Sequence, residues 1–286
     1  MSKSGGNKMT RMPTFYLSHG GGPWPWMKDH FGPMFDKLEK SLQQLAPSLP
    51  ERPKAILMIS GHWENPEFTL SSSPNPPMFY DYQGFPEHTY RIKYPAPGSP
   101  ELAERVRALL AAGGVVAKLD PERGFDHGTF TVAAVAFPQA DIPIVQLSLR
   151  HGYDPAAHLA LGRLLAPLRD EGILIIGSGV SFHNFGKLSP EGTIPSRLFD
   201  AWLQKTLTAS SAAEREEQLK HWTDAPAARI AHPREDHLVP LMVAVGAGLD
   251  EPGTCVYNDS TMFGSITVSS FRFGLADDPS AAFATA

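Results

Sequence analysis

The chain has 286 residues, of which 42% are hydrophobic and 19% charged, and its formal net charge is −5. These values are typical of a globular protein with one full hydrophobic core, and without a lysine and arginine cluster we expect no nucleic-acid partner. The single Cys255 excludes an intramolecular disulfide and a cysteine-based zinc site, so the eleven histidines are the softest metal ligands that the chain offers.

The ends of the chain carry no targeting signal that we recognise. Residues 1–12 are polar and basic without an apolar core, and no run approaches the roughly 20 apolar residues of a membrane span. We therefore expect a soluble, cytoplasmic protein without a membrane partner, and the sequence leaves homo-oligomerisation open. We assign one domain to residues 13–275, with residues 1–12 and 276–286 as flexible termini.

Three apolar, strand-like runs each lead to a histidine just after small residues. The first run, residues 14–17, ends at once in a histidine, three glycines and a proline, and the others cover residues 55–59 and 173–176. Runs of this kind are typical of parallel strands covered on both faces. The histidines reached in this way are His19, His62 and His183. Because ligands of open α/β sheets bind outside the carboxyl ends of the strands, we predict a metal site there.

Hydrophobic periodicity predicts the remaining elements. Helices are expected at 31–45, 100–112, 129–137 and 155–168, and further strands at 67–70, 115–119 and 144–149. Residues 195–245 are expected to be nearly all helical, before a strand pair near 254–257 and 265–271. This alternation predicts a single α/β domain with a mostly parallel central sheet flanked by helices.

Residues 71–98 are dense in proline, serine and aromatic side chains. A loop of this length in a compact domain is usually functional or disordered, and its aromatic content argues against disorder. We interpret it as a lid or pocket wall, with a simple cover over a sheet edge as the alternative.

Two of the three histidines are our clearest metal ligands. His19 and His62 both sit beside glycine, which lets a ligand approach closely, and neither lies on a helix face. His183 is open between a metal ligand and a base that touches only substrate. Its neighbour Asn184 is open between a pocket donor and a helix cap.

The third ligand is sought in residues 232–240, which we expect to open a helix. We choose His237, while Glu235 and Asp236 are alternatives because acidic residues also occur at helix starts without any ligand role.

A fifth histidine follows an acidic residue at a glycine-flanked turn. His127 could donate to bound substrate or dioxygen, and Asp126 is equally a helix cap. The histidines without such context are assigned to structure or surface: His30, His88, His151, His158 and His221.

Two other site types fit poorly. The His19 to Gly22 run is similar to the oxyanion motif of lipases, but no Gly-x-Ser-x-Gly elbow accompanies it. No Gly-Lys-Ser/Thr follows the glycines, which excludes a phosphate-binding loop.

Taken together, the motifs resemble one enzyme family. They are Ser18-His19-Gly20-Gly21-Gly22-Pro23, Ser60-Gly61-His62-Trp63-Glu64, Gly84-Phe85-Pro86-Glu87, Tyr94-Pro95-Ala96-Pro97-Gly98, Asp126-His127-Gly128, residues 142–148 and residues 232–241. From about residue 13 to 272 the chain resembles the class III extradiol ring-cleavage dioxygenases of the LigB superfamily, and among these the 4,5-DOPA dioxygenase type.

The resemblance implies a non-haem Fe(II) enzyme that opens the ring of a catechol with dioxygen, with zinc also found in some members. It implies that His19, His62 and His237 hold the metal, that His183 is the acid/base and that His127 assists. The protocatechuate branch has a carboxylate as its third ligand. His88 lies where relatives tend to carry an apolar residue, so we do not assign the known substrate of any relative to this chain.

The chemistry of the residues agrees with this implication. Three ligands on one face of a metal leave positions for a catechol and dioxygen, and a neutral histidine can accept a proton at neutral pH. The side chains that we expect to form apolar walls around the ring, or else to be core, are Trp24, Trp26, Trp63, Phe85 and Tyr90.

Two other functions use the same residues. A zinc hydrolase would activate a water at the open position of a three-ligand site. A catalytically silent metal-binding scaffold would keep the fold alone.

Overall fold

The computed structural model describes residues 10–274. Most of the two predicted flexible termini, residues 1–9 and 276–286, lies outside this part. Met12 belongs to the described part: it is buried, and its N–H donates to the carbonyl of Arg169 at 3.1 Å. The ordered chain therefore begins before residue 13.

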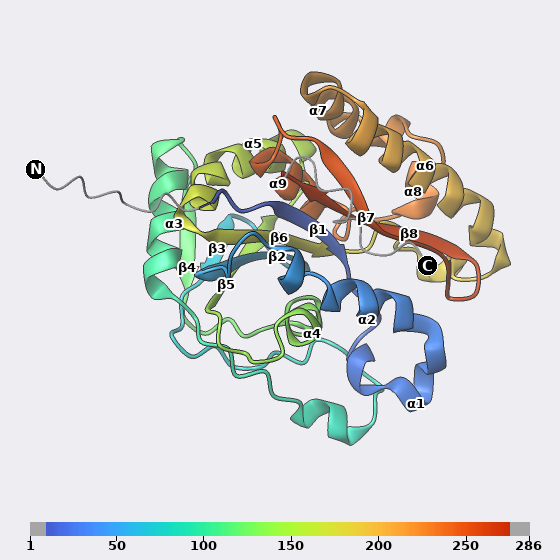
Figure 1. Ribbon diagram of the computed structural model, residues 1–286, viewed down its shortest axis with the longest axis horizontal. Coiled ribbons are helices and arrows are strands. Elements are labelled where there is room, and N and C mark those ends of the chain that lie inside the picture. Colours follow the sequence, from blue (N-terminus) through green and yellow to red (C-terminus); the bar gives the residue numbers. More distant parts are fainter. Residues whose placement is uncertain (1–9, 275–286) are drawn as a thin grey trace, which may run out of the picture.

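One eight-stranded sheet crosses the described part of the molecule (Figure 1). Its strands are β1 (Thr14–Ser18), β2 (Ala55–Asn65), β3 (Phe68–Ser71), β4 (Ala117–Asp120), β5 (Ile144–Arg150), β6 (Ile173–Gly179), β7 (Gly253–Met262) and β8 (Ile266–Phe273). Their order is β4-β3-β5-β2-β6-β1-β8-β7. The four central strands, β5, β2, β6 and β1, are mutually parallel, whereas β3 and β8 pair with them antiparallel. The predicted α/β class with a mostly parallel central sheet is confirmed.

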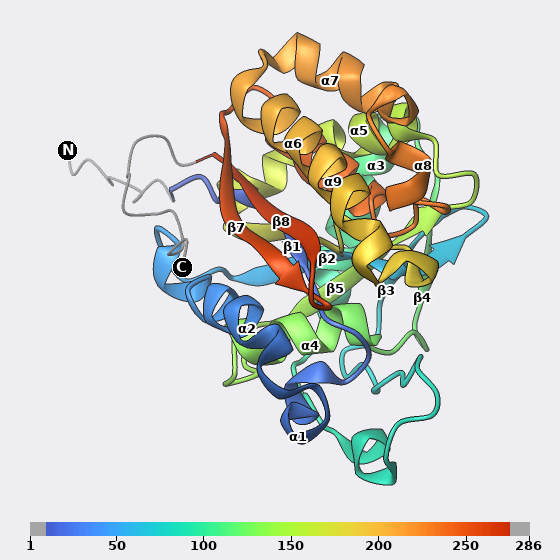
Figure 2. The same cartoon turned by 90° about the vertical axis from the view of Figure 1, so that its right-hand side faces the viewer.

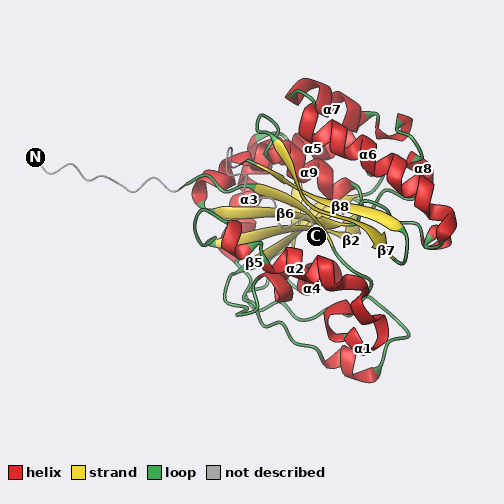
Figure 3. Cartoon of the chain, turned by 45° about the vertical axis from the view of Figure 1, so that its right-hand side comes forward, coloured by secondary structure: helices red, strands yellow, loops and turns green. Residues whose placement is uncertain are grey.

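Helices cover both faces of the sheet (Figure 3). They are α1 (Lys28–Phe31), α2 (Asp36–Gln43), α3 (Pro100–Ala112), α4 (His127–Ala136), α5 (Pro155–Leu165), α6 (Thr193–Ala209), α7 (Ala212–Lys220), α8 (Ala228–Ala231) and α9 (Val239–Ala247). Alternate strand residues enter two hydrophobic clusters: Ile56 and Met58 join the one that includes α2 and α4, and Leu57 and Ile59 join the one that includes α3 and α5. Helix α6 packs on β7 and β8 (Figure 2).

Strand β2 differs from its prediction. The sequence indicates a strand end at Ile59 and a turn before His62, but β2 continues to Asn65. The pairing with β5 shifts register between Ile59 and Glu64 and then resumes at Glu64 opposite Leu149. This is a bulge, which disturbs the ladder locally and redirects side chains without ending the strand. His62 therefore projects from an irregular strand.

The helix that we expect to open within residues 232–240 starts later than most of this range, so this prediction is also wrong in part. Helix α9 begins only at Val239, with Pro240 in its first turn, where proline's missing N–H costs nothing. The preceding residues form a turn in which the N–H groups of Leu238 and Val239 both donate to the carbonyl of Glu235 at 2.9 Å. His237 thus lies in a turn before the helix.

The only helical element of residues 71–98 is a short 3-10 helix, Glu87–Arg91. Met78 forms a β-bridge with Phe125, so this segment is attached to the chain just before α4. Between residues 10 and 274 the helices are too short or too polar to span a bilayer.

Candidate metal centre

The carboxyl ends of three adjacent parallel strands, β2, β6 and β1, meet at one level. Ser18 is opposite Gly179, and Ser60 is opposite Ser178. The N–H of His19 donates to the carbonyl of Gly179 at 2.9 Å, which continues the β1–β6 ladder into the loop. The rings of His19 and His62 consequently lie 5.0 Å apart between centroids, with His19 just after β1 and His62 in the last part of β2.

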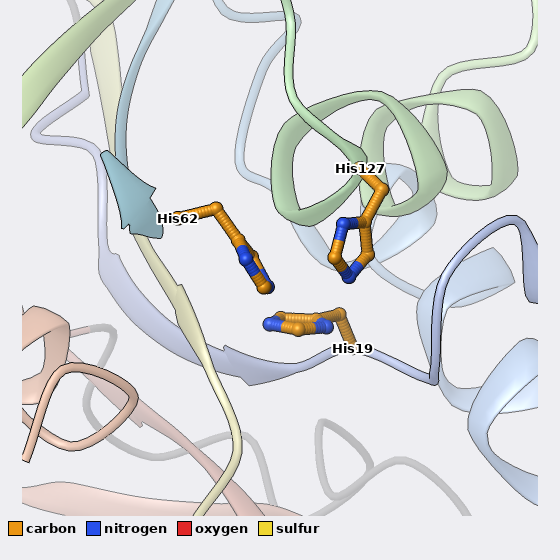
Figure 4. A group of neighbouring side chains, drawn as sticks. All are labelled: His19, His62 and His127. Atoms are coloured by element: carbon orange, nitrogen blue, oxygen red, sulfur yellow. The ribbon is translucent and has the colours of Figure 1, made fainter. Parts of the chain in front are cut away.

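His127 joins this pair from the first turn of α4. Its ring centroid is 3.9 Å from that of His62 and 5.3 Å from that of His19, and the three rings face one space (Figure 4). One ring nitrogen from each of the three lies within 4.8 Å of the others, a spacing that could hold a metal ion.

His237 reaches the same space from the turn before α9. Its Nε2 lies 3.1 Å from the Nε2 of His62, and its ring centroid is 5.2 Å from that of His19. His183 stacks on His237 with centroids 3.5 Å apart and an interplanar angle of 15°. The structure therefore brings together all five histidines that the sequence singles out.

Hydrogen bonds leave lone pairs directed into the cluster. The Nδ1 of His19 lies 2.9 Å from the carbonyl oxygen of Gly20, to which it donates, so Nε2 carries the lone pair. This Nε2 is buried without a hydrogen-bond partner among the described residues. The Nδ1 of His62 lies 3.3 Å from a carboxylate oxygen of Asp81, which leaves its Nε2 toward His237.

The protonation of these rings suits metal binding. Burial, with the neighbouring His127 adding to it, lowers the pKa of His19 to about 3. Burial also lowers the pKa of His62 and of His237 well below the usual value, so all three rings are neutral at neutral pH. Two nitrogens about 2.1 Å from one ion lie about 3.0 Å apart at a right angle and about 3.4 Å apart at the tetrahedral angle, and the 3.1 Å between the Nε2 atoms of His62 and His237 falls in this range. The donor set fits a divalent metal ion.

The two acidic neighbours of His237 make different contacts. Glu235 pairs with Arg229 at 2.6 Å. One Asp236 oxygen accepts from the backbone N–H of His237 at 3.1 Å, and the other lies 3.3 Å from its Nδ1. This Nδ1 has no hydrogen-bond partner among the described residues, and ligand atoms of His183, Asp236 and His237 lie within 4.8 Å of one another, so Asp236 stays an alternative metal ligand.

The loop that carries His183 is held by backbone contacts. The N–H of His183 donates to the carbonyl of Ala231 at 2.9 Å, and the side chain of Asn184 donates to Ile230 and accepts from Gly186. Asn184 therefore caps a turn. Burial lowers the pKa of His183, a partly buried ring, so it too is neutral at neutral pH.

The remaining assignments separate structural from site residues. Asp126 caps α4, because it accepts from the N–H of Thr129 at 3.0 Å. His158 is a satisfied core residue with both ring nitrogens hydrogen-bonded to backbone groups. The other histidines assigned to structure or surface are exposed: His30, His88, His151 and His221.

The five expected wall residues differ in burial. Trp24 and Trp63 are almost fully buried at 2% and 6% exposure, and Trp24 packs against Phe35 in the core. Phe85 and Tyr90 are only partly buried, and Phe85 packs closely on Gly22 of the loop after β1. Trp26 is more exposed, with its ring 5.9 Å from that of Phe130.

Sequence patterns missed Asp81 and Tyr16. Asp81 stands within the aromatic segment 71–98 without any motif, and Tyr16 looks like an ordinary strand residue. In the structure the Tyr16 hydroxyl donates to the carbonyl of His237 at 2.8 Å, and Asp81 contacts His62 and His127. Burial opposes ionisation of Asp81, but its hydrogen bonds with His127 outweigh burial and lower its pKa. Only an alignment of relatives could have revealed either residue from sequence.

The turn that carries His237 is pressed onto β6 at Gly179. A Cβ on Gly179 would lie 2.0 Å from the carbonyl oxygen of His237, a distance that no side chain tolerates. Gly179→Ala is therefore expected to displace the turn, to cost about 1–3 kcal/mol of unfolding free energy and to weaken metal affinity. Chemical denaturation and zinc titration measure both effects.

The matched control for this substitution is Gly21→Ala. A Cβ on Gly21 meets nothing within 4 Å, so the stability of that variant should equal that of the wild type. Wild-type stability and metal affinity in Gly179→Ala would contradict the expected displacement.

Comparison with known proteins identifies one family. Residues 6–271 match the family described as the catalytic LigB subunit of aromatic ring-opening dioxygenase. The chain is 39% identical over 265 residues to the 4,5-DOPA dioxygenase extradiol of Beta vulgaris, covering 91% of this chain and 96% of that protein. It is 35% identical over 272 residues to the Escherichia coli K12 protein of the same name, covering 93% and 96%.

The chain is also similar to a fungal dioxygenase and to a solved bacterial structure. The dioxygenase tasH of Hapsidospora irregularis is 36% identical, with 94% of this chain and 88% of that protein covered. The crystal structure of the uncharacterized protein JW3007 from Escherichia coli K12 superposes with a TM-score of 0.74 at 33% identity, covering 92% of this chain and all of that one.

Proposed function

Because the chain belongs to the LigB family of aromatic ring-opening dioxygenases, we propose that it is an Fe(II)-dependent extradiol dioxygenase that opens the ring of a catechol, DOPA-like or otherwise substituted, with dioxygen. The observation that carries this proposal is the histidine cluster just after β1 and in the last part of β2, where the Nε2 atoms of His62 and His237 lie 3.1 Å apart and the Nε2 of His19 is buried without a hydrogen-bond partner among the described residues. The activity is that of an oxidoreductase.

His19, His62 and His237 would hold the metal. Each is a neutral ring at neutral pH, and the Nε2 atoms of His62 and His237 are already 3.1 Å apart. When bound, an iron ion with three protein ligands supplies open positions at which the two oxygens of a catechol and dioxygen meet. Zinc fits the same imidazole donors, so the isolated protein is expected to accept either metal.

His183 is the proton acceptor in this proposal. Its ring is partly buried, neutral at neutral pH and stacked on His237, so a basic nitrogen would stand beside the proposed metal ligands. A neutral imidazole in this position can remove a proton from a catechol hydroxyl and return it later in the reaction. His127 would assist through Nε2, since its Nδ1 is engaged by Asp81.

The aromatic residues would enclose the substrate ring. Phe85 and Tyr90, partly buried in the segment 71–98, offer apolar surface that can hold a ring and exclude water. Trp24 and Trp63 would support this wall from the protein interior, where they are nearly fully buried.

Oxygen uptake tests the proposal directly. The full-length protein is stripped of metal, reloaded anaerobically with Fe(II) or Zn(II), and offered a panel of catechols that includes DOPA. We expect uptake of one dioxygen per catechol and a ring-opened product with Fe(II) only. Zinc-dependent ester or amide cleavage without oxygen would indicate the hydrolase instead, and tight metal binding without either reaction would indicate a scaffold.

A further inference from the structure

The aromatic segment 71–98 is joined to the chain that leads into α4. The N–H of Phe79 donates to the carbonyl of Phe125, and the N–H of Phe125 donates to the carbonyl of Pro77, both at 2.8 Å. Gln146 of β5 holds the same turn, because its side chain donates to the carbonyl of Gly124 at 3.0 Å. This two-sided attachment places Asp81, two residues after Phe79, at the histidine cluster.

Asp81 contacts two histidines that come from different elements. Its carboxylate accepts from the backbone N–H of His127 at 2.9 Å and lies 2.9 Å from the Nδ1 of that residue. It also lies 3.3 Å from the Nδ1 of His62 on β2. The Asp81 side chain is 10% exposed, so water competes little for these contacts.

A carboxylate constrains the protonation of each ring that it faces. It can only accept hydrogen bonds, so a neutral ring beside it carries its proton on Nδ1 and its lone pair on Nε2. Left to itself a neutral imidazole distributes its proton between both nitrogens, and only one of the two tautomers can bind a metal through Nε2.

We propose that Asp81 is a positioning residue that holds His62 and His127 together as Nδ1–H tautomers and so presents both Nε2 lone pairs to the metal site. The inference rests on the proposed function in one respect, namely that His62 binds metal. It assigns a purpose to the fold of the aromatic segment: the chain that supplies Phe85 and Tyr90 also orients the histidines, so substrate wall and metal site are built on one support. Carboxylates that hydrogen-bond to metal-binding histidines typically raise metal affinity by about 10–100-fold.

Metal affinity of Asp81 variants tests the proposal. Metal-free full-length protein competes with a chromophoric chelator for Zn(II). Asp81→Asn keeps the shape, but its amide NH2 replaces one of the two oxygens and turns a donor either toward the two rings or toward the backbone N–H of His127. We expect its zinc affinity to fall by about 10–100-fold, and the visible spectrum of its Co(II) form to change. Asp81→Glu should recover part of the affinity because it restores the carboxylate.

Asp259→Asn is the matched control. Asp259 is buried to a similar degree, at 2% exposure, and accepts from the N–H of Thr261 at 2.8 Å without touching a site histidine. Its zinc affinity and cobalt spectrum should equal those of the wild type. Wild-type affinity and spectrum in Asp81→Asn would overturn the inference, whereas a wild-type protein that binds no metal would overturn the proposed function.

A second measurement needs no substitution at Asp81. Long-range proton–nitrogen NMR of the metal-free wild type reports which ring nitrogen is protonated, and His62→Gln and His127→Gln assign the signals. Two Nδ1–H rings support the inference, and Nε2–H at both positions would overturn it even where the Asp81 variants fail to fold.

Discussion

His237→Ala is expected to abolish measurable Fe(II) and Zn(II) binding, whereas His127→Ala retains it. The Nε2 of His237 lies 3.1 Å from that of His62, the separation of two ligands on one ion, whereas His127 has only an assisting role in the proposed function. Loss of a residue that only hydrogen-bonds to a ligand weakens metal affinity by up to roughly 100-fold, and removal of a ligand itself should weaken it by more. Chelator competition on metal-free protein measures this loss.

The same experiment decides between two ligand sets. His19, His62 and His127 also offer nitrogens within 4.8 Å of one another. If His127→Ala loses the metal and His237→Ala keeps it, the third ligand is His127 and the role proposed for His237 is wrong. His221→Ala, at an exposed histidine paired with Glu217, is the control that should bind metal as the wild type does.

His183→Ala is expected to lower kcat by about 10²–10⁴-fold, the usual contribution of a positioned general base, while metal affinity is retained. The ring of His183 stacks on His237 but lies on a separate loop, held through its backbone N–H by Ala231. Its removal therefore takes away a proton acceptor without removing any of the three proposed ligands. Single-turnover measurement of ring opening in the iron-loaded protein isolates this step from product release.

His183→Gln serves as the companion variant, since it keeps a hydrogen-bonding side chain but cannot accept a proton at neutral pH. Both variants should be impaired alike if proton transfer is the role of His183. Wild-type turnover in either one would show that the base lies elsewhere. Recovery in His183→Gln alone would indicate a hydrogen-bonding role.

A large part of the fold is visible in local sequence. Strands β5 and β6 and helix α3 are apolar runs or apolar periodicities bounded by glycine and proline, so pattern alone places them within a few residues. The positions of His19 and His62 follow from the same signals. Both stand beside glycine after an apolar, strand-like run, and parallel strands end at one edge of a sheet. Only the continuation of β2 past His62 departs from this prediction.

Local sequence fails where partners are distant in the chain. The bulge in β2 depends on renewed pairing of Glu64 with β5, and the turn of His237 depends on the proline positions together with its contact on Gly179. Hydrophobic periodicity predicts neither the bulge nor the turn, because each depends on a contact between segments many residues apart.

By itself the sequence determined the fold class, the set of histidines and the family resemblance, because these rest on residue types, their spacing and local hydrophobic pattern. Only the tertiary structure decided how the five histidines share one space, that Asp236 contacts the ring of His237, and that Asp81 bridges His62 and His127. The physical reason is that ligand geometry is set by the packing of separate elements. Asp81 is 46 residues from His127, and the hydrogen bond between them forms only when the aromatic segment folds against the start of α4.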